Sequence, residues 1–158
     1  MNWSDVLEEP TLQDLPFKIE MNEWGKIVLS PASNKHGILQ AEIVGFLRDH
    51  RKAGKIITEC SISSTKGVKV ADVAWASIDF FKKYGFDTPY PEAPEVCVEI
   101  ISPSNSTQEM QEKMMLYLSK GAKEVWVCDE NGLLFLYSYQ GLLEHSNIFQ
   151  NFPKKIEF

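Results

Sequence analysis

The sequence predicts one domain of the α/β or α+β class, with a mixed central sheet flanked by helices. Its 158 residues, 44% of them hydrophobic and 24% charged, fit one globular domain over residues 1–158 and would cramp two. Hydrophobic patterns typical of strands and of helices follow one another along the chain. Their order is hairpin, helix, two strands, buried strand, helix and two strands, which indicates the mixed class.

The first third of the chain predicts an arm, a hairpin and a helix. Residues 1–16 contain two prolines and scattered leucines, so we expect an ordered N-terminal arm or short helix. Residues 17–30 alternate weakly in polarity and are broken at residues 22–25, which indicates a hairpin with its turn at that break. Residues 35–52 carry apolar side chains at i, i+4, i+7 and i+8, and predict an amphipathic helix that Gly54 ends.

The middle of the chain predicts three strands. Residues 56–62 and 68–76 are strand-like and are joined by a short turn. Residues 82–94 contain three prolines and a glycine, and indicate a loop. Residues 96–101 are apolar except for one carboxylate, as is typical of a strand buried on both faces.

The last third predicts a helix and two further strands. Ser106 and Glu109 have the spacing of a capping box at the start of a helix, and Gly121 marks its end. Residues 124–129 and 133–139 then predict two strands joined by a tight turn. Because the helix connects the buried strand to the next one, we expect these two strands to pair in parallel.

Net charge and cysteine content restrict the function classes. With 16 basic and 22 acidic residues and a net charge of −6, nucleic-acid binding would have to rest on a local basic patch. Cys60, Cys97 and Cys128 lie far apart without a C-x-x-C motif, which argues against a disulfide framework and a zinc ribbon. Because we find no apolar stretch of membrane-spanning length and no signal peptide, we expect a cytoplasmic protein with no membrane partner.

Two carboxylates stand among apolar strand residues. Asp72 shares a predicted strand face with Val68 and Val70, and Glu99 lies inside the apolar run 96–101. An uncompensated buried ion costs several kcal/mol, whereas a whole domain is stable by only about 5–15 kcal/mol. We therefore expect the two acids to be paired with cations, bound to a metal or placed beside a cleft.

Lys113 and Glu42 lie on the borders of the buried stripes of the two predicted long helices. Together with Asp72 and Glu99 they would form a cluster that suits a hard divalent cation, magnesium or manganese. Such a metal activates water and stabilises charge on a phosphate, so phosphodiester hydrolysis is the reaction that most needs this set.

The same residues permit plainer interpretations. One such interpretation is an inert buried ion cluster of Asp72, Glu99 and Lys113. For Glu42, a position that faces solvent fits the sequence as well as a position in the site. The three histidines show no ligand spacing and are assigned to surface or capping positions: His36, His50 and His145. The serines at 102 and 104 lie in no nucleophile-elbow motif and indicate a turn.

Several segments together resemble one known family. They are residues 30–36, 70–74, 94–104, Lys113-x-x-x-Tyr117 and 121–129. They resemble the Uma-two family of the PD-(D/E)XK, or restriction-endonuclease-like, superfamily. The resemblance extends over about residues 27–137 and implies a restriction-endonuclease-like core at about residues 27–139. It also implies that Asp72 and Glu99 are metal-binding acids.

The sequence departs from the superfamily pattern in two places. The usual lysine two residues after the second acid is replaced by Ile101, and Lys113 matches the helix position to which the lysine has moved in the family. Ala71 replaces the usual proline before the first acid, which costs little because that proline shapes the backbone. Glu42 carries over only as a candidate helix acid.

The sequence therefore predicts a magnesium- or manganese-dependent endonuclease that hydrolyses phosphodiester bonds in DNA. Asp72 and Glu99 would hold the metal, Lys113 would assist the attacking water, and Glu42 would support the site. A homodimer is plausible, since nucleases of this kind often address both strands as dimers. The alternative is a catalytically degenerate binding or regulatory module, which the acidic net charge and Ile101 favour. A transposon-linked or RNA-processing role would share the chemistry and differ in substrate.

Overall fold

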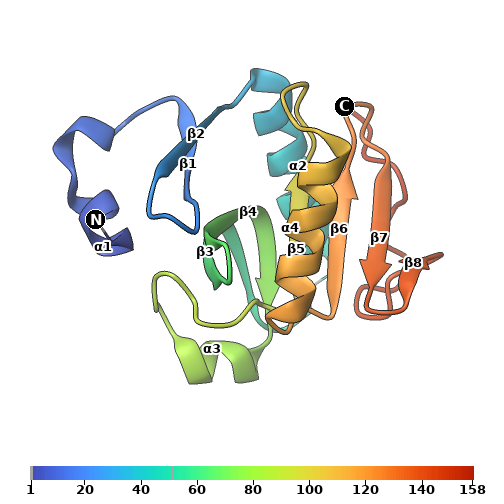
Figure 1. The fold of residues 1–158 in the computed structure, drawn as a ribbon. Coiled ribbons are helices and arrows are strands. Elements are labelled where there is room, and N and C mark those ends of the chain that lie inside the picture. The colour runs from blue at the N-terminus through green and yellow to red at the C-terminus, as the bar shows by residue number, and fades with distance from the viewer. Residues whose placement is uncertain (1, 51) are drawn as a thin grey trace.

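The computed structural model describes residues 2–50 and 52–158, and its strands form one mixed sheet (Figure 1). Across these residues the strand order is β2-β1-β4-β5-β6-β7-β8, and β3 pairs with β4. The strands are β1 (Phe17–Met21), β2 (Ile27–Pro31), β3 (Lys55–Ser64), β4 (Gly67–Ala76), β5 (Val96–Ile100), β6 (Glu124–Cys128), β7 (Leu134–Ser138) and β8 (Gly141–Leu143). The structure confirms the predicted mixed sheet flanked by helices.

Helices cover both faces of this sheet. They are α1 (Trp3–Glu8), α2 (Asn34–Asp49), α3 (Ile78–Tyr84) and α4 (Thr107–Ser119), with the 3-10 turn η1 (Pro10–Leu12). The buried side of α2 packs with Val73 and Val98, whereas that of α4 packs with Ala74 and Cys97. Because neighbouring residues of a strand face opposite sides of a sheet, α2 and α4 lie on opposite faces.

The centre of the sheet is its most buried part. All five residues of β5 and all five of β6 are buried, as their nearly continuous apolar sequences predict. The two strands pair in parallel, with Glu99 opposite Val127, and α4 connects them. β4 pairs with β5 in antiparallel orientation. The predicted parallel pair is therefore confirmed.

The two long helices begin at serine N-caps, of which the one at Ser106 was predicted. The Ser33 side chain accepts a hydrogen bond from the His36 amide, and the Ser106 side chain accepts one from the Glu109 amide. The carboxylate of Glu109 accepts from the Asn105 side chain, so the reciprocal half of the predicted capping box is replaced by this contact.

Two element boundaries differ from the prediction. α2 ends at Asp49, well before Gly54; residue 51 of the predicted helix lies outside the described residues. α3 occupies residues 78–84, so it begins before the predicted loop and runs into it. Its start depends on Ser77, whose side chain accepts a hydrogen bond from the Phe80 amide. This N-cap is the signal that the sequence prediction overlooked.

The three cysteines are buried and free. Burial raises the pKa of Cys60 and of Cys128 to about 12, and it raises that of Cys97 well above its ordinary value. In residues 2–50 and 52–158, no helix combines the length and the apolar character that crossing a bilayer requires.

Candidate active site

Asp72 and Glu99 lie side by side where the pairing of β4 with β5 ends. The last paired residues are Val73 and Val98, so the next position along is Asp72 on one strand and Glu99 on the other. In place of a further backbone bond, Asp72 Oδ2 accepts a hydrogen bond from the Ile100 amide at 2.7 Å. The two acids are only 1% and 3% exposed. Strand register thus brings together the two carboxylates that the sequence singles out.

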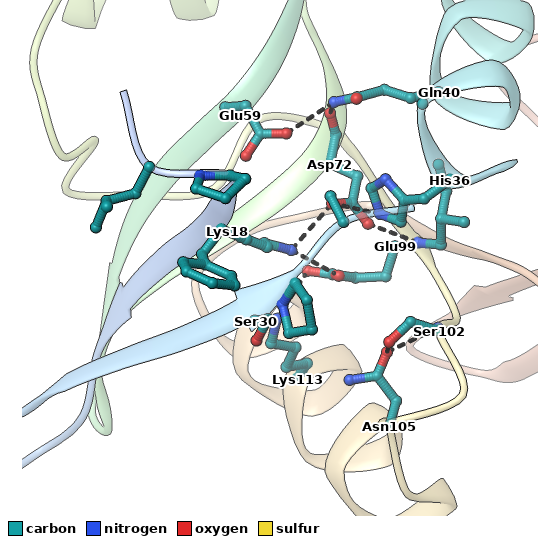
Figure 2. A pocket seen from close by; sticks show the side chains of 17 residues that line it. Lys18, Ser30, His36, Gln40, Glu59, Asp72, Glu99, Ser102, Asn105 and Lys113 are labelled. Carbon is teal, nitrogen blue, oxygen red and sulfur yellow. Dashed lines mark hydrogen bonds and ion pairs between the residues drawn. The ribbon is translucent and has the colours of Figure 1, made fainter. Parts of the chain in front are cut away.

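The ammonium of Lys18 bridges these two acids (Figure 2). Lys18 lies on β1, and its Nζ is 3.1 Å from Asp72 Oδ1 and 3.1 Å from Glu99 Oε2. Burial would lower the pKa of Lys18, but the charges of Glu99 and Asp72 outweigh this and raise it above its ordinary value. Lys18 is therefore a cation at neutral pH, and it offsets part of the charge of the two acids.

Lys113 contacts the other oxygen of Glu99. Its Nζ is 3.4 Å from Glu99 Oε1 and 2.8 Å from Glu20 Oε2. Tyr117, one turn further along α4, donates its hydroxyl to the same Glu99 oxygen at 2.6 Å, because residues four apart share a helix face. Glu20 also accepts a hydrogen bond from the Val70 amide at 2.7 Å. Three carboxylates and two lysines thus form one buried network.

The three acids of this network differ in how easily they ionise. Burial alone would raise the pKa of Asp72, but the Lys18 charge helps to hold it below its ordinary value. Burial also opposes the ionisation of Glu20, yet Lys113 and Lys18 keep its pKa low. For Glu99, burial outweighs the attraction of both lysines and the pKa is raised. Of the three, Glu99 is therefore the acid whose burial the two lysines do not offset.

Helix α2 contributes two polar side chains beside Asp72. His36 Nε2 is 3.3 Å from Asp72 Oδ1, and the hydrogen bond to Asp72 raises the pKa of His36. The prediction that His36 occupies a surface or capping position is therefore wrong. Gln40 Nε2 donates to the Asp72 carbonyl oxygen at 2.7 Å and to Glu59 Oε1 at 2.8 Å. Glu59 has a φ of 51° and lies opposite Asp72, where the pairing of β3 and β4 skips one position.

These side chains line a cavity of about 400 Å³. Figure 2 shows them converging from β1, β4, β5, α2 and α4, with Ser102 and Asn105 of the loop after β5 on one side. The polar and charged lining residues are Lys18, Ser30, His36, Gln40, Glu59, Asp72, Glu99, Ser102, Asn105 and Lys113. Carboxylates and cationic groups thus face the same cavity, which is open to solvent on one side, as acid–base or metal-assisted chemistry requires.

Comparison with known proteins assigns the chain to a family. A family model described as "Putative restriction endonuclease" (Uma2) matches residues 9–153. The chain belongs to the Uma2 family. This membership confirms the resemblance that the sequence motifs indicate, and it supports a nuclease-type hydrolase.

A solved structure has a fold similar to that of this Uma2 protein. It is the crystal structure of "a putative nuclease belonging to DUF820" from Anabaena variabilis ATCC 29413, with a TM-score of 0.68 and 20% sequence identity. The similarity covers 89% of this chain and 80% of that one. At this identity, the comparison establishes a shared fold. The search of curated proteins finds no match.

The structure brings three of the four predicted site residues of this Uma2 protein together. Asp72, Glu99 and Lys113 lie in one network, whereas Glu42 is exposed and does not line the cavity. A helix turns by about 100° per residue, so Glu42 lies about 160° around α2 from Gln40, which faces the cavity. The structure therefore does not bring Glu42 to the site, contrary to the prediction.

Lys18 and Glu20 are the two network members that the sequence prediction overlooked. They are two residues apart on β1, so both side chains point to the same face of the sheet. An opposite-charge pair with this spacing inside a strand was the available signal. It is a weak one, because antiparallel strands often carry charged residues on a face that meets water.

The residues of the Uma2 site fit a divalent cation. The Lys18 ammonium marks a position for a cation, because one oxygen of Asp72 and one oxygen of Glu99 both contact it. Magnesium is commonly held by one or two carboxylates together with waters, and the adjoining cavity has room for waters. Within residues 2–50 and 52–158, no three His, Cys, Asp or Glu side chains are grouped as metal ligands. Waters or substrate would therefore complete the coordination.

Proposed function

We propose that this Uma2 protein is a magnesium- or manganese-dependent endonuclease that hydrolyses phosphodiester bonds in DNA. One observation carries the proposal: Asp72 Oδ1 and Glu99 Oε2 face a single cation position beside a cavity of about 400 Å³. Family membership supports the nuclease chemistry, and the hard oxygen donors support the choice of metal.

Asp72 and Glu99 would hold the metal. Asp72 is oriented for this by the Ile100 amide and Glu99 by the Tyr117 hydroxyl, so one oxygen of each acid is fixed and the other is presented. A bound magnesium ion would lower the pKa of a water ligand and offset charge that develops on the phosphate.

Lys113 would assist the attacking water. An ammonium has three N–H donors; Glu20 and Glu99 take two of those of Lys113, and a third is left for a water or a phosphate oxygen in the cavity that Lys113 lines. His36 lines the same cavity and can donate a hydrogen bond to an anionic substrate when it is protonated.

A second candidate function is a catalytically degenerate module that binds nucleic acid without cutting it. One contact favours it: the Lys18 ammonium already bridges the two acids that a metal would need. Such a module needs no divalent cation. A homodimer, which would present two sites to one duplex, stays a prediction for either function.

The test is cleavage of double- and single-stranded DNA by the purified protein with magnesium or manganese. Asp72→Asn and Glu99→Gln keep the side-chain size and remove the charge, and we expect each to lower the rate by about 100-fold or more. Asp79→Asn is the matched control, because Asp79 is an exposed acid of α3 outside the cavity. It should cut at the wild-type rate.

Two outcomes would count against the proposal, one against cleavage and one against the acids assigned to it. If the wild-type protein cuts no DNA with either metal but still binds it, the degenerate module is the better description. If cleavage survives unchanged in both Asp72→Asn and Glu99→Gln, these acids do not hold the catalytic metal. Cleavage of RNA in place of DNA would keep the site and change the substrate.

A further inference from the structure

The two lysines of the site divide the oxygens of Glu99 between them. Lys113 and Tyr117 take Oε1, at 3.4 Å and 2.6 Å, and Lys18 takes Oε2 at 3.1 Å. Asp72 is shared in the same way, since its Oδ2 accepts from the Ile100 amide and its Oδ1 faces Lys18. Each acid therefore has one oxygen anchored by a hydrogen bond from the protein framework and a second oxygen in contact with Lys18. At Asp72 this second oxygen, Oδ1, also lies 3.3 Å from His36 Nε2.

This division makes Lys18 replaceable while the acids stay oriented. The anchors of Asp72 and Glu99 come from the β5 backbone and from α4, and neither involves β1. Lys18 comes from β1 alone, and its side chain is 11% exposed and lines the cavity. The ammonium can thus move into the cavity without breaking the bonds that hold the two carboxylates.

An ammonium and a divalent ion cannot share this position. A magnesium ion lies about 2.0–2.1 Å from its oxygen ligands, so an ion bound to both Asp72 Oδ1 and Glu99 Oε2 would overlap the present position of the Lys18 Nζ. Two cations so close would also repel each other strongly in a buried site. Lys113 offers no such conflict, because it contacts the anchored oxygen of Glu99.

We propose that Lys18 is a built-in counter-ion of the metal site. It positions and neutralises the Asp72–Glu99 pair in the metal-free protein, and a divalent cation binds only by displacing it. Lys18 therefore sets the affinity of the site for a cation and the charge of the cations that it accepts. This inference rests on the proposed function, because it takes the acid pair as the place where the metal binds.

The experiment is calorimetric titration of the metal-free protein with manganese. Lys18→Met keeps most of the stem and removes the charge, and we expect it to bind manganese roughly tenfold more tightly than the wild-type protein, within the usual range of coupling between two sites. Lys26→Met is the matched control, because Lys26 is an exposed lysine of the same hairpin and its loss changes the net charge equally. It should bind like the wild type.

A second readout covers the case in which Lys18→Met folds poorly. Lys18→Gln keeps a hydrogen-bond donor and removes the charge, and manganese should raise the melting temperature of this variant more than that of the wild type. Thermal melts with and without manganese measure this directly and require no cleavage activity.

The outcomes separate this inference from the proposed nuclease. Equal, measurable manganese affinity in wild type and both Lys18 variants would overturn the role of Lys18 and leave the metal site standing. Binding in the variants but none in the wild type would support Lys18 as the counter-ion and overturn the metal-dependent nuclease. If no variant binds manganese, both proposals fail.

Discussion

Replacing Lys113 by methionine measures how strongly the buried acids depend on their lysines. Methionine keeps most of the apolar stem and removes an ammonium that lies 2.8 Å from Glu20 Oε2 and 3.4 Å from Glu99 Oε1. Glu99 keeps the Tyr117 hydroxyl and the Lys18 ammonium. Glu20, which is 4% exposed, keeps the hydrogen bond from the Val70 amide. Both buried acids therefore lose part of their compensation.

Removing one partner of a buried ion pair typically costs about 3–5 kcal/mol. In a chain of this length each kcal/mol lowers the melting temperature by roughly 2–4 °C, so Lys113→Met should melt about 10 °C below the wild type. Urea denaturation at neutral pH gives the free energy of unfolding. Because the Lys113 charge holds the pKa of Glu20 below its ordinary value of 4.5, the difference between variant and wild type is full above that pH and shrinks as the pH falls further.

Lys66→Met is the control for this experiment. Lys66 pairs with Glu112 at the surface, where both side chains are about half exposed, and water screens such pairs. The control should unfold close to the wild type. If Lys113→Met is no less stable than Lys66→Met at neutral pH, the buried acids do not depend on the Lys113 charge for their stability.

Two further predictions concern the turns and the pH dependence. Gly67→Ala should destabilise the protein by at least about 1–3 kcal/mol, the usual cost of a strained backbone conformation, because Gly67 has a φ of 88° and a Cβ there would in addition collide with the Met21 carbonyl oxygen. Gly45→Ala, in open space on α2, should be neutral or stabilising in the same urea melts. His36 has a raised folded pKa, so in metal-free protein its stabilising contact should be complete below about pH 6.5 and lost as the pH rises through the folded pKa. Melts of wild type and His36→Gln across this range should converge at high pH, and a constant difference would contradict the assignment.

Much of the architecture followed from local patterns. The parallel pair of β5 and β6 was predictable because both strands are continuous apolar runs separated by one amphipathic helix with a serine cap. The N-cap of α3 was overlooked because the prolines that follow the helix dominate the pattern of that segment. Local hydrogen bonding, in this case by Ser77, decided where the loop gave way to a helix.

The candidate site was predictable only in part. Asp72 and Glu99 stood out because each interrupts an apolar strand, and Lys113 because it lies beside a buried helix stripe. Lys18 reaches them from β1 and lies 54 residues before Asp72 along the chain. The spacing of apolar residues within one segment cannot predict a contact between residues so far apart in the sequence. Such a contact depends on the order and register of the strands in the sheet. The same limit explains Glu42, whose border position on α2 matched that of Lys113 but turned away from the cavity.

The buried thiols give this protein an internal reporter. Cys97 lies on β5 two residues before Glu99, and its sulfur is sealed from solvent in the native state. Only a thiolate reacts quickly with alkylating reagents, so labelling at this residue must wait until the central strands part. The labelling rate of Cys97 would therefore measure how often β5 becomes exposed to solvent, without any engineered probe. A ligand that binds Asp72 and Glu99 in the native state should slow this labelling.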